Sequence, residues 1–251
     1  MVDQEQTIPP LTPPPITPFP RAVLLDVGFT LTFLNGARIA AAAERSGVRV
    51  IAAALEQAER QIRREIAQFA WAATATDQSE TKKMAGAAFF RRLLELAEAI
   101  ASDASLDAAA QAIWAHHQAQ NLWCRVGTGV DDALVRMRGA GIKLAVVSNS
   151  EGTIEAMLEE VGLRRHMEAV FDSWVVGVAK PDPAVFNLAL DHLGVSARDA
   201  IMVGDTPAAD VVGAQAAGVR AVLIDPYDLH PSAEVPRFRD LPAFVDRLLA
   251  Q

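Results

Sequence analysis

The chain has 251 residues, of which 51% are hydrophobic and 22% are charged. This balance excludes an intrinsically disordered protein, which would be poor in apolar residues and rich in charge. The length suits one large domain, or a core domain with a smaller inserted one. The formal charge of −8 disfavours nucleic acid and anionic membranes as partners, because proteins bind both through basic surfaces.

The cysteine content and the lack of recognisable targeting signals together predict the cellular compartment. The single cysteine, Cys124, excludes an internal disulfide and a site built from several cysteines. No stretch reaches the ~18–20 apolar residues that a membrane-spanning helix needs. Residues 1–20 have no basic patch followed by an apolar run, so they do not resemble a secretory signal. We therefore expect a cytoplasmic protein that does not contact the membrane.

Proline marks the beginning of the fold. Seven of the 14 prolines lie in residues 1–20, and none occurs between Arg21 and Lys180. Proline at this density excludes regular helix and sheet, so residues 1–20 are predicted to be a disordered or extended arm. Its spaced Pro-x-x-Pro pairs are also a possible ligand for an aromatic groove, although a flexible arm without such a role is the favoured interpretation.

The first element after the arm is a buried strand at Ala22–Leu25, and a long helical insert follows it. Residues 35–124 are rich in the helix formers Ala, Glu, Gln, Arg and Leu, with apolar residues at helical spacing. Three or four helices are expected there. An insert at this position would lie over the carboxyl edge of the sheet, where such folds bind ligands.

The rest of the chain alternates between short apolar runs and amphipathic stretches. The runs predicted as further strands are Lys143–Val147, Trp174–Val178, Ile201–Val203 and Ala221–Ile224. The stretches predicted as helices are Val130–Gly139, Gly152–Val161, Pro183–Leu193 and Ala208–Ala217. This alternation predicts an α/β fold with a doubly wound parallel sheet. Its core domain would comprise residues 21–34 and 125–251, with residues 35–124 as a helical cap domain.

Polar residues follow four of the predicted strands: Asp26, Ser148, Lys180 and Asp205. Because the carboxyl ends of parallel strands meet at one edge of a sheet, these side chains are expected to converge. Two carboxylates, a hydroxyl and an ammonium group suit a phosphate with Mg²⁺, which prefers oxygen ligands.

The segment after the first strand offers a nucleophile. Asp26 at a strand end can attack phosphorus to form an acyl-phosphate, and Thr30 is placed to hydrogen-bond the transferring group. Taken alone, Asp26 is equally compatible with capping the following turn.

Four motifs occur in order and resemble those of the haloacid dehalogenase (HAD) superfamily. They are Asp26-x-x-x-Thr30, Ser148-Asn149, Lys180-Pro181, and Gly204-Asp205 with Asp210 five residues later. The resemblance covers residues 21–226, and the insert resembles the small helical cap of that family. It implies a HAD-like hydrolase acting on a small phosphorylated molecule.

The resemblance also implies a role for each matching residue. Mg²⁺ would be held by Asp26, by the backbone carbonyl of Gly28, by Asp205 and by Asp210. Asp26 would also be the nucleophile.

The remaining matching residues would handle the substrate. Ser148 would bind a phosphate oxygen with Asn149 beside it, and Lys180 would neutralise the nucleophile and the developing charge.

One position departs from the family pattern and leaves three functions open. Family phosphatases usually carry a second aspartate where this chain has Gly28, and a general acid or base is worth ~10²–10⁴-fold in rate. The favoured function is a Mg²⁺-dependent phosphatase that forms an aspartyl-phosphate. The alternatives are a 2-haloacid dehalogenase using an aspartyl ester, and a low-turnover phosphate-binding or regulatory protein. No motif identifies the substrate or the oligomeric state.

Overall fold

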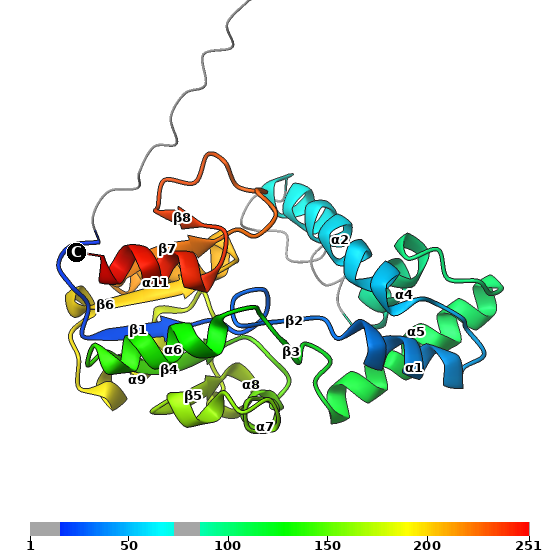
Figure 1. Ribbon diagram of the computed structural model, residues 1–251, viewed down its shortest axis with the longest axis horizontal. Helices are drawn as coiled ribbons and strands as arrows, with labels where there is room; N and C mark the ends of the chain where they lie inside the picture. Colours follow the sequence, from blue (N-terminus) through cyan, green and yellow to red (C-terminus); the bar gives the residue numbers. More distant parts are fainter. Residues whose placement is uncertain (1–15, 73–85, 251) are drawn as a thin grey trace, which may run out of the picture.

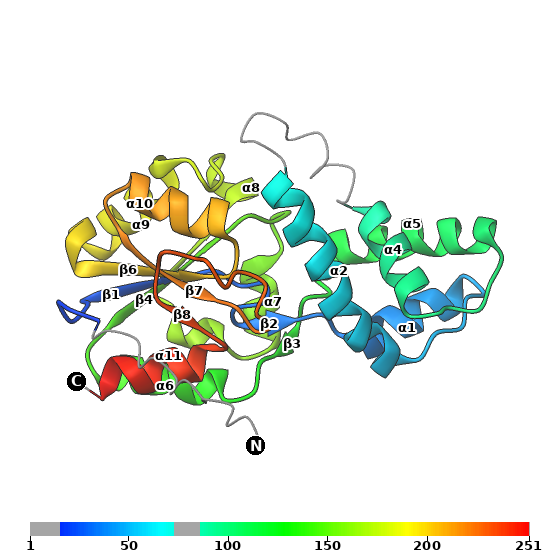
Figure 2. The same cartoon turned by 90° about the horizontal axis from the view of Figure 1, so that it is seen from above.

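The protein is described by a computed structural model over residues 16–72 and 86–250. Its centre is a six-stranded sheet in the order β5-β4-β1-β6-β7-β8, and every pairing in it is parallel (Figures 1 and 2). The strands are β1 (Ala22–Leu25), β4 (Lys143–Ser148), β5 (Ala169–Asp172), β6 (Ala200–Gly204), β7 (Arg220–Ile224) and β8 (Arg237–Phe238). The prediction of an α/β fold with a doubly wound parallel sheet is confirmed.

Helices cover both faces of the sheet and create two apolar cores. One face carries α6 (Val130–Gly139), α7 (Ile154–Glu160) and α11 (Leu241–Leu249), and the other carries α9 (Pro183–Leu193) and α10 (Gly213–Ala216). Because successive side chains of a strand point to opposite faces, Val23 and Leu25 enter the first core while Ala22 and Leu24 enter the second. Burial on both faces explains why β1 is an uninterrupted apolar run.

Among the described residues, four helices form a separate unit beside the sheet (right in Figure 1). They are α1 (Gly36–Arg45), α2 (Ala52–Ala72), α4 (Ala87–Leu96) and α5 (Asp103–Ala119). This unit, called the cap below, has its own core, in which Phe90 and Leu93 of α4 are fully buried. Two short antiparallel strands, β2 (Thr32–Phe33) and β3 (Arg125–Val126), connect the cap to the sheet.

The predicted strand Trp174–Val178 is wrong. This segment contains the short helix α8 (Ser173–Val176), and the strand is β5, which ends just before it. The Asp172 carboxylate accepts a hydrogen bond from the backbone N–H of Trp174 and thereby caps the helix. Trp174 and Val175 are 76% and 72% exposed, so this apolar run does not lie in the core.

A second correction concerns the predicted helix Ala208–Ala217. The chain forms a π-helical segment at Pro207–Val212 and only then the short helix α10. Rare π-helical turns change the direction of a side chain relative to regular α-helix. Here the segment contains Asp210, one of the predicted metal ligands, so the irregularity lies at the candidate site.

The N-terminal arm is described only in part. Residues 1–15 lie outside the described residues, whereas residues 16–20 are placed without helix or strand. Ile16 packs into the core under α6 and α11 and is 6% exposed. The packed chain therefore begins before residue 21, the residue at which the proline pattern predicts that the fold begins.

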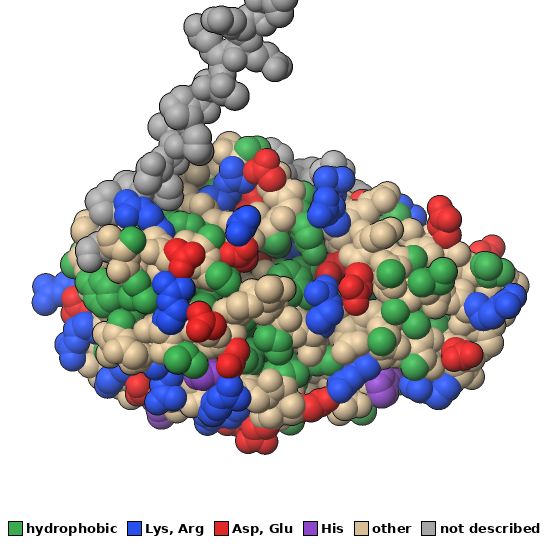
Figure 3. Space-filling model, in the orientation of Figure 1, with side chains coloured by type: hydrophobic (Ala, Val, Ile, Leu, Met, Phe, Trp, Pro, Cys, Tyr) green, Lys and Arg blue, Asp and Glu red, His purple; other side chains and the backbone are tan. Residues whose placement is uncertain are grey.

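The surface mixes both signs of charge. On the face shown in Figure 3, acidic and basic side chains are interspersed over the sheet unit and the cap. In the part of the chain that the structure describes, no helix combines the length and the apolar character required to span a membrane.

Candidate active site

Strand register brings three of the predicted site residues to one edge of the sheet. Leu25 of β1 pairs with Val146 of β4 on one side and with Val203 of β6 on the other. The next residue, Asp26, donates its backbone N–H to the carbonyl of Val203 over 2.9 Å. Ser148 and Asp205 lie two residues beyond these partners, at the ends of β4 and β6. Asp26, Ser148 and Asp205 are all less than 9% exposed.

Lys180 reaches the same edge from a loop that Asn149 holds in place. The side-chain amide of Asn149 donates to the carbonyl of Lys180 and accepts from its backbone N–H, each over 2.8 Å. The Nζ atom of Lys180 then donates to the Oδ1 atoms of Asp26 (2.6 Å) and Asp210 (2.7 Å). Both functional groups of the Asn149 side chain are used in this way, so Asn149 is a positioning residue for Lys180.

The Asp210 carboxylate is held against the end of β6. It accepts a hydrogen bond from the backbone N–H of Thr206 over 2.8 Å. A Cβ atom at Gly204 would lie only 2.3 Å from the Asp210 carboxyl carbon. Glycine is therefore needed at position 204, because any side chain there would displace the carboxylate.

The site buries three carboxylates, those of Asp26, Asp205 and Asp210, with too few cations to balance their charge. Burial is the largest influence on the Asp26 carboxyl, and together with Asp210 and Asp205 it raises the pKa to about 7 against the opposing effect of Lys180. Burial also raises the pKa of Asp205, with Arg63 opposing it. Burial lowers the pKa of Lys180, but Asp210 and Asp26 outweigh it and raise that pKa above its ordinary value.

The donor set fits a divalent cation. Asp26, Asp205 and Asp210 each offer a carboxylate oxygen, and these oxygens lie within 4.8 Å of one another. Oxygen ligands of this kind are what Mg²⁺ prefers. Carboxylates that favour protons when buried together also favour a metal ion, because it supplies the missing positive charge. The residues present therefore suit Mg²⁺.

One charged contact at the site was not predicted from the sequence. Arg63 of the cap helix α2 forms an ion pair with Asp205, and its side chain is 15% exposed. The guanidinium carbon lies 4.1 Å from the centroid of the Phe29 ring, a distance typical of a cation–π contact. Phe29 adopts a φ of +56°, which is strained for a bulky residue and places its ring beneath the cap. The cap thus contributes a cation to the cluster.

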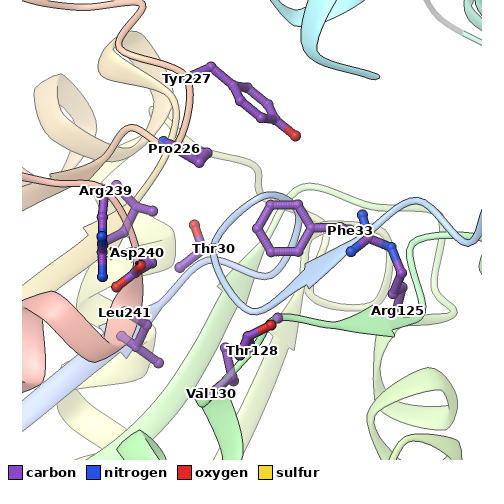
Figure 4. Close-up of a pocket in the computed structure, with 12 residues that line it drawn as sticks. Thr30, Phe33, Arg125, Thr128, Val130, Pro226, Tyr227, Arg239, Asp240 and Leu241 are labelled. Atoms are coloured by element: carbon purple, nitrogen blue, oxygen red, sulfur yellow. Dashed lines mark ion pairs between the residues drawn. The ribbon is translucent and has the colours of Figure 1, made fainter. Parts of the chain in front are cut away.

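Thr30 lies in a different hollow from the acidic cluster. It lines a pocket of about 360 Å³ at the joint between cap and sheet, together with Phe33, Arg125 and Tyr227 (Figure 4). The four charged residues of the cluster are not among the residues lining this pocket. The Thr30 hydroxyl is buried and finds no hydrogen-bond partner among the described residues.

A buried carboxylate, that of Glu59, stabilises the same connection between the cap and the sheet. Glu59 of α2 is 1% exposed and accepts hydrogen bonds from the backbone N–H of Leu34 (2.7 Å), from Arg125 (3.2 Å) and from the Tyr227 hydroxyl (3.3 Å). Burial raises the pKa of Glu59, although these donors favour its charged form.

Gly28 lies two residues after Asp26 and has space around it. A Cβ atom there would be 3.8 Å from Cδ1 of Trp123, which is ordinary van der Waals contact. Gly28 does not adopt a positive φ, so its backbone is open to other residues.

Comparisons with known proteins show which family this sequence and fold match. The family model described as haloacid dehalogenase-like hydrolase matches residues 20–218. A Mus musculus protein, "Haloacid dehalogenase-like hydrolase domain-containing protein 3", is 38% identical over 49% of this chain and 50% of its own length. The "Phosphoserine phosphatase" of Thermus thermophilus is 43% identical over 37% of each chain. The chain therefore spans half or less of the length of these relatives.

A solved structure extends the likeness over most of the chain. The magnesium-bound "putative HAD-hydrolase YfnB" from Bacillus subtilis superposes with a TM-score of 0.62 at 21% identity, covering 91% of this chain and 98% of its own. At this identity the likeness supports the fold alone, whereas the family model matches well over half of the sequence. The chain belongs to the haloacid dehalogenase-like hydrolase family.

Proposed function

We propose that the protein is a Mg²⁺-dependent phosphatase that hydrolyses a small phosphomonoester through an aspartyl-phosphate on Asp26. The observation that carries this proposal is the buried cluster in which Lys180 bridges Asp26 and Asp210 and three carboxylate oxygens lie within 4.8 Å. The name of the Thermus relative, a phosphatase, agrees with it. In this proposal residues 35–124 act as a cap domain over a core domain of residues 21–34 and 125–251, to which Ile16 also contributes.

The first half of the reaction uses residues of the sheet edge. An Asp26 carboxylate oxygen attacks phosphorus, and the ester oxygen leaves with the bonding electron pair and takes up a proton. Lys180, charged and fixed by Asn149, favours the ionised form of Asp26 and offsets the charge that develops on the phosphoryl oxygens. Ser148, at the end of β4, is placed to donate its hydroxyl to one of those oxygens.

The second half restores the enzyme. Water attacks phosphorus, the bond between phosphorus and the Asp26 oxygen breaks, and inorganic phosphate is released. Asp26, Asp205, Asp210 and the carbonyl of Gly28 would hold Mg²⁺, which would supply positive charge against the phosphoryl group. With glycine at position 28 this chain has no carboxylate at the usual acid/base position, which favours substrates whose leaving oxygen needs little protonation.

Turnover of p-nitrophenyl phosphate tests the proposal, since nitrophenolate leaves without a proton. We expect hydrolysis that requires Mg²⁺, is abolished by EDTA and is lost in Asp26→Asn. Activity without metal, or in Asp26→Asn, would exclude the proposed mechanism.

Gly28 also supports a second function, in which the protein binds phosphate compounds with little turnover. Loss of a general acid or base costs ~10²–10⁴-fold in rate and does not require loss of binding. Tight binding of inorganic phosphate in Mg²⁺ without hydrolysis of any ester would favour it. Release of chloride from 2-chloropropionate without Mg²⁺ would instead identify the third function left open by the sequence, a 2-haloacid dehalogenase.

A further inference from the structure

The cap presents to the candidate active site a cation, Arg63, whose hydrogen-bond donors are incompletely used. Arg63 projects from α2, pairs with Asp205 and rests against the ring of Phe29. Its Nε atom is buried and has no hydrogen-bond partner in the described structure. A guanidinium group carries five donors in a fixed plane, so this side chain retains the capacity to bind a further acceptor at the site.

Metal binding would increase that capacity. Asp205 is one of the three carboxylates suited to Mg²⁺, and a carboxylate oxygen that binds a metal ion is a weaker partner for a guanidinium group. Arg63 is only 15% exposed, so water replaces the lost partner poorly. An unpaired charge at such a position is costly. The group that would satisfy it is an anion next to the reacting phosphate.

A pocket for the rest of the substrate opens beside this arginine. Its volume is about 650 Å³, which is within the range of small-molecule sites. It begins at Thr206, whose hydroxyl donates to Asp205, and it extends between α2 and residues 228–233. Its titratable lining residues are Arg64, Asp228 and His230, and most of the others are apolar. Asp205 therefore contacts both Arg63 and a residue that lines the pocket, Thr206.

We propose that Arg63 is a specificity-determining residue that binds a carboxylate on the leaving group of the substrate. The inference rests on the phosphatase function proposed above and assigns its substrate class: phosphomonoesters of hydroxy acids. The Phe29 ring lies 4.1 Å from the guanidinium carbon and supports it, and the carboxylate takes the place that Asp205 occupies in the metal-free protein.

Substrate pairs that differ only in charge test this assignment. The long pair is 4-carboxyphenyl phosphate and 4-carbamoylphenyl phosphate, and the short pair is phosphoglycolate and its amide. In Mg²⁺ we expect kcat/KM to favour the carboxylate of at least one pair by roughly 10- to 100-fold, the range of one or two charge-assisted hydrogen bonds. Arg63→Met, which keeps an apolar stem against Phe29, should reduce that ratio to nearly 1.

Two matched variants locate the effect. Arg60→Met removes an exposed cation from the same helix, where Arg60 lies over the Tyr227 ring at 5.5 Å, and should leave the ratio unchanged. Arg64→Met removes the cation that lines the pocket itself. If the ratio falls in Arg64→Met and not in Arg63→Met, the assignment to Arg63 is overturned.

A binding measurement separates this inference from the proposed function. The phosphonate analogues of both pairs, in which CH₂ replaces the ester oxygen, cannot be hydrolysed, and calorimetry gives their affinities in Mg²⁺. A carboxylate preference that disappears in Arg63→Met supports the inference even if no ester is turned over. Equal affinities within both pairs for the unchanged protein refute it, even if p-nitrophenyl phosphate is hydrolysed normally.

Discussion

Position 28 offers the sharpest test of the proposed chemistry, because the carboxyl group that Gly28 lacks can be introduced there by mutation. A Cβ atom there would meet its nearest neighbour, Trp123 Cδ1, at 3.8 Å, and the backbone does not have a positive φ. Gly28→Asp should therefore fold normally and place a carboxyl group two residues from Asp26, the proposed nucleophile.

The expected gain depends on the leaving group. For an alkyl phosphate, whose alkoxide must be protonated as it leaves, a general acid is worth ~10²–10⁴-fold, or about 3–5 kcal/mol in the activation free energy. For p-nitrophenyl phosphate the leaving group needs no proton. Because kcat/KM reports the steps up to the first irreversible one, Gly28→Asp should raise it for ethyl phosphate and leave it nearly unchanged for p-nitrophenyl phosphate.

Gly28→Asn is the matched control, since its amide has the size of the carboxyl group but does not transfer a proton. The assay is phosphate release from both esters by all three proteins, with thermal unfolding to confirm comparable folding. Equal gains from Asp and Asn, or no gain for ethyl phosphate with a well-folded Gly28→Asp protein, would refute proton transfer as the missing function.

Three further outcomes follow from the buried charges. Lys180→Met leaves Asp26 and Asp210 without their shared cation, so in EDTA at pH 8 urea denaturation should show a loss of about 3–5 kcal/mol; an unchanged midpoint would contradict the bridging role. Glu59→Ala leaves the N–H of Leu34 unpaired and should cost about 1–3 kcal/mol by the same measurement, whereas Glu59→Gln should retain most of the stability. Because the pKa of Asp26 is about 7 in the metal-free protein, Mg²⁺ must displace a proton from Asp26 below that pH. Calorimetry should therefore show that the affinity for Mg²⁺ falls by up to about tenfold for each pH unit below 7. An affinity that does not change with pH would exclude Asp26 as a ligand.

The apolar strands of the sheet were predictable because each is buried on both faces. Burial makes β1, β4, β6 and β7 uninterrupted apolar runs, and their positions agree with the sequence pattern to within a residue or two. The strand β5 was missed because it lies at the edge of the sheet, where two of its four residues are only half-buried. The sequence pattern favours the more apolar run beside it, Trp174–Val178, although hydrophobicity there reflects exposed side chains of a short helix.

The sequence also indicated the residues that gather at the sheet edge, since parallel strands bring their carboxyl ends together. This reasoning holds for Asp26 and Asp205, which follow β1 and β6. Lys180 and Asp210 join them from a loop and from the π-helical segment, because the strand expected before Lys180 is the short helix α8. The contribution of the cap was not predictable in this way. Arg63 is one of several arginines on a long helix, and its approach to Asp205 depends on how the cap packs against the sheet, which no local pattern encodes.

The junction between cap and sheet has a consequence for engineering. The chain enters and leaves the cap side by side, with the Asn35 N–H bonded to the Leu122 carbonyl over 2.9 Å and the strands β2 and β3 paired just before that point. A tight hairpin turn in place of residues 35–122 would therefore join the two strands without moving either. The cap can therefore be exchanged as a unit. Joining the helical insert of another family member to the same pair of strands would change the cap residues that face the site and keep those at the sheet edge.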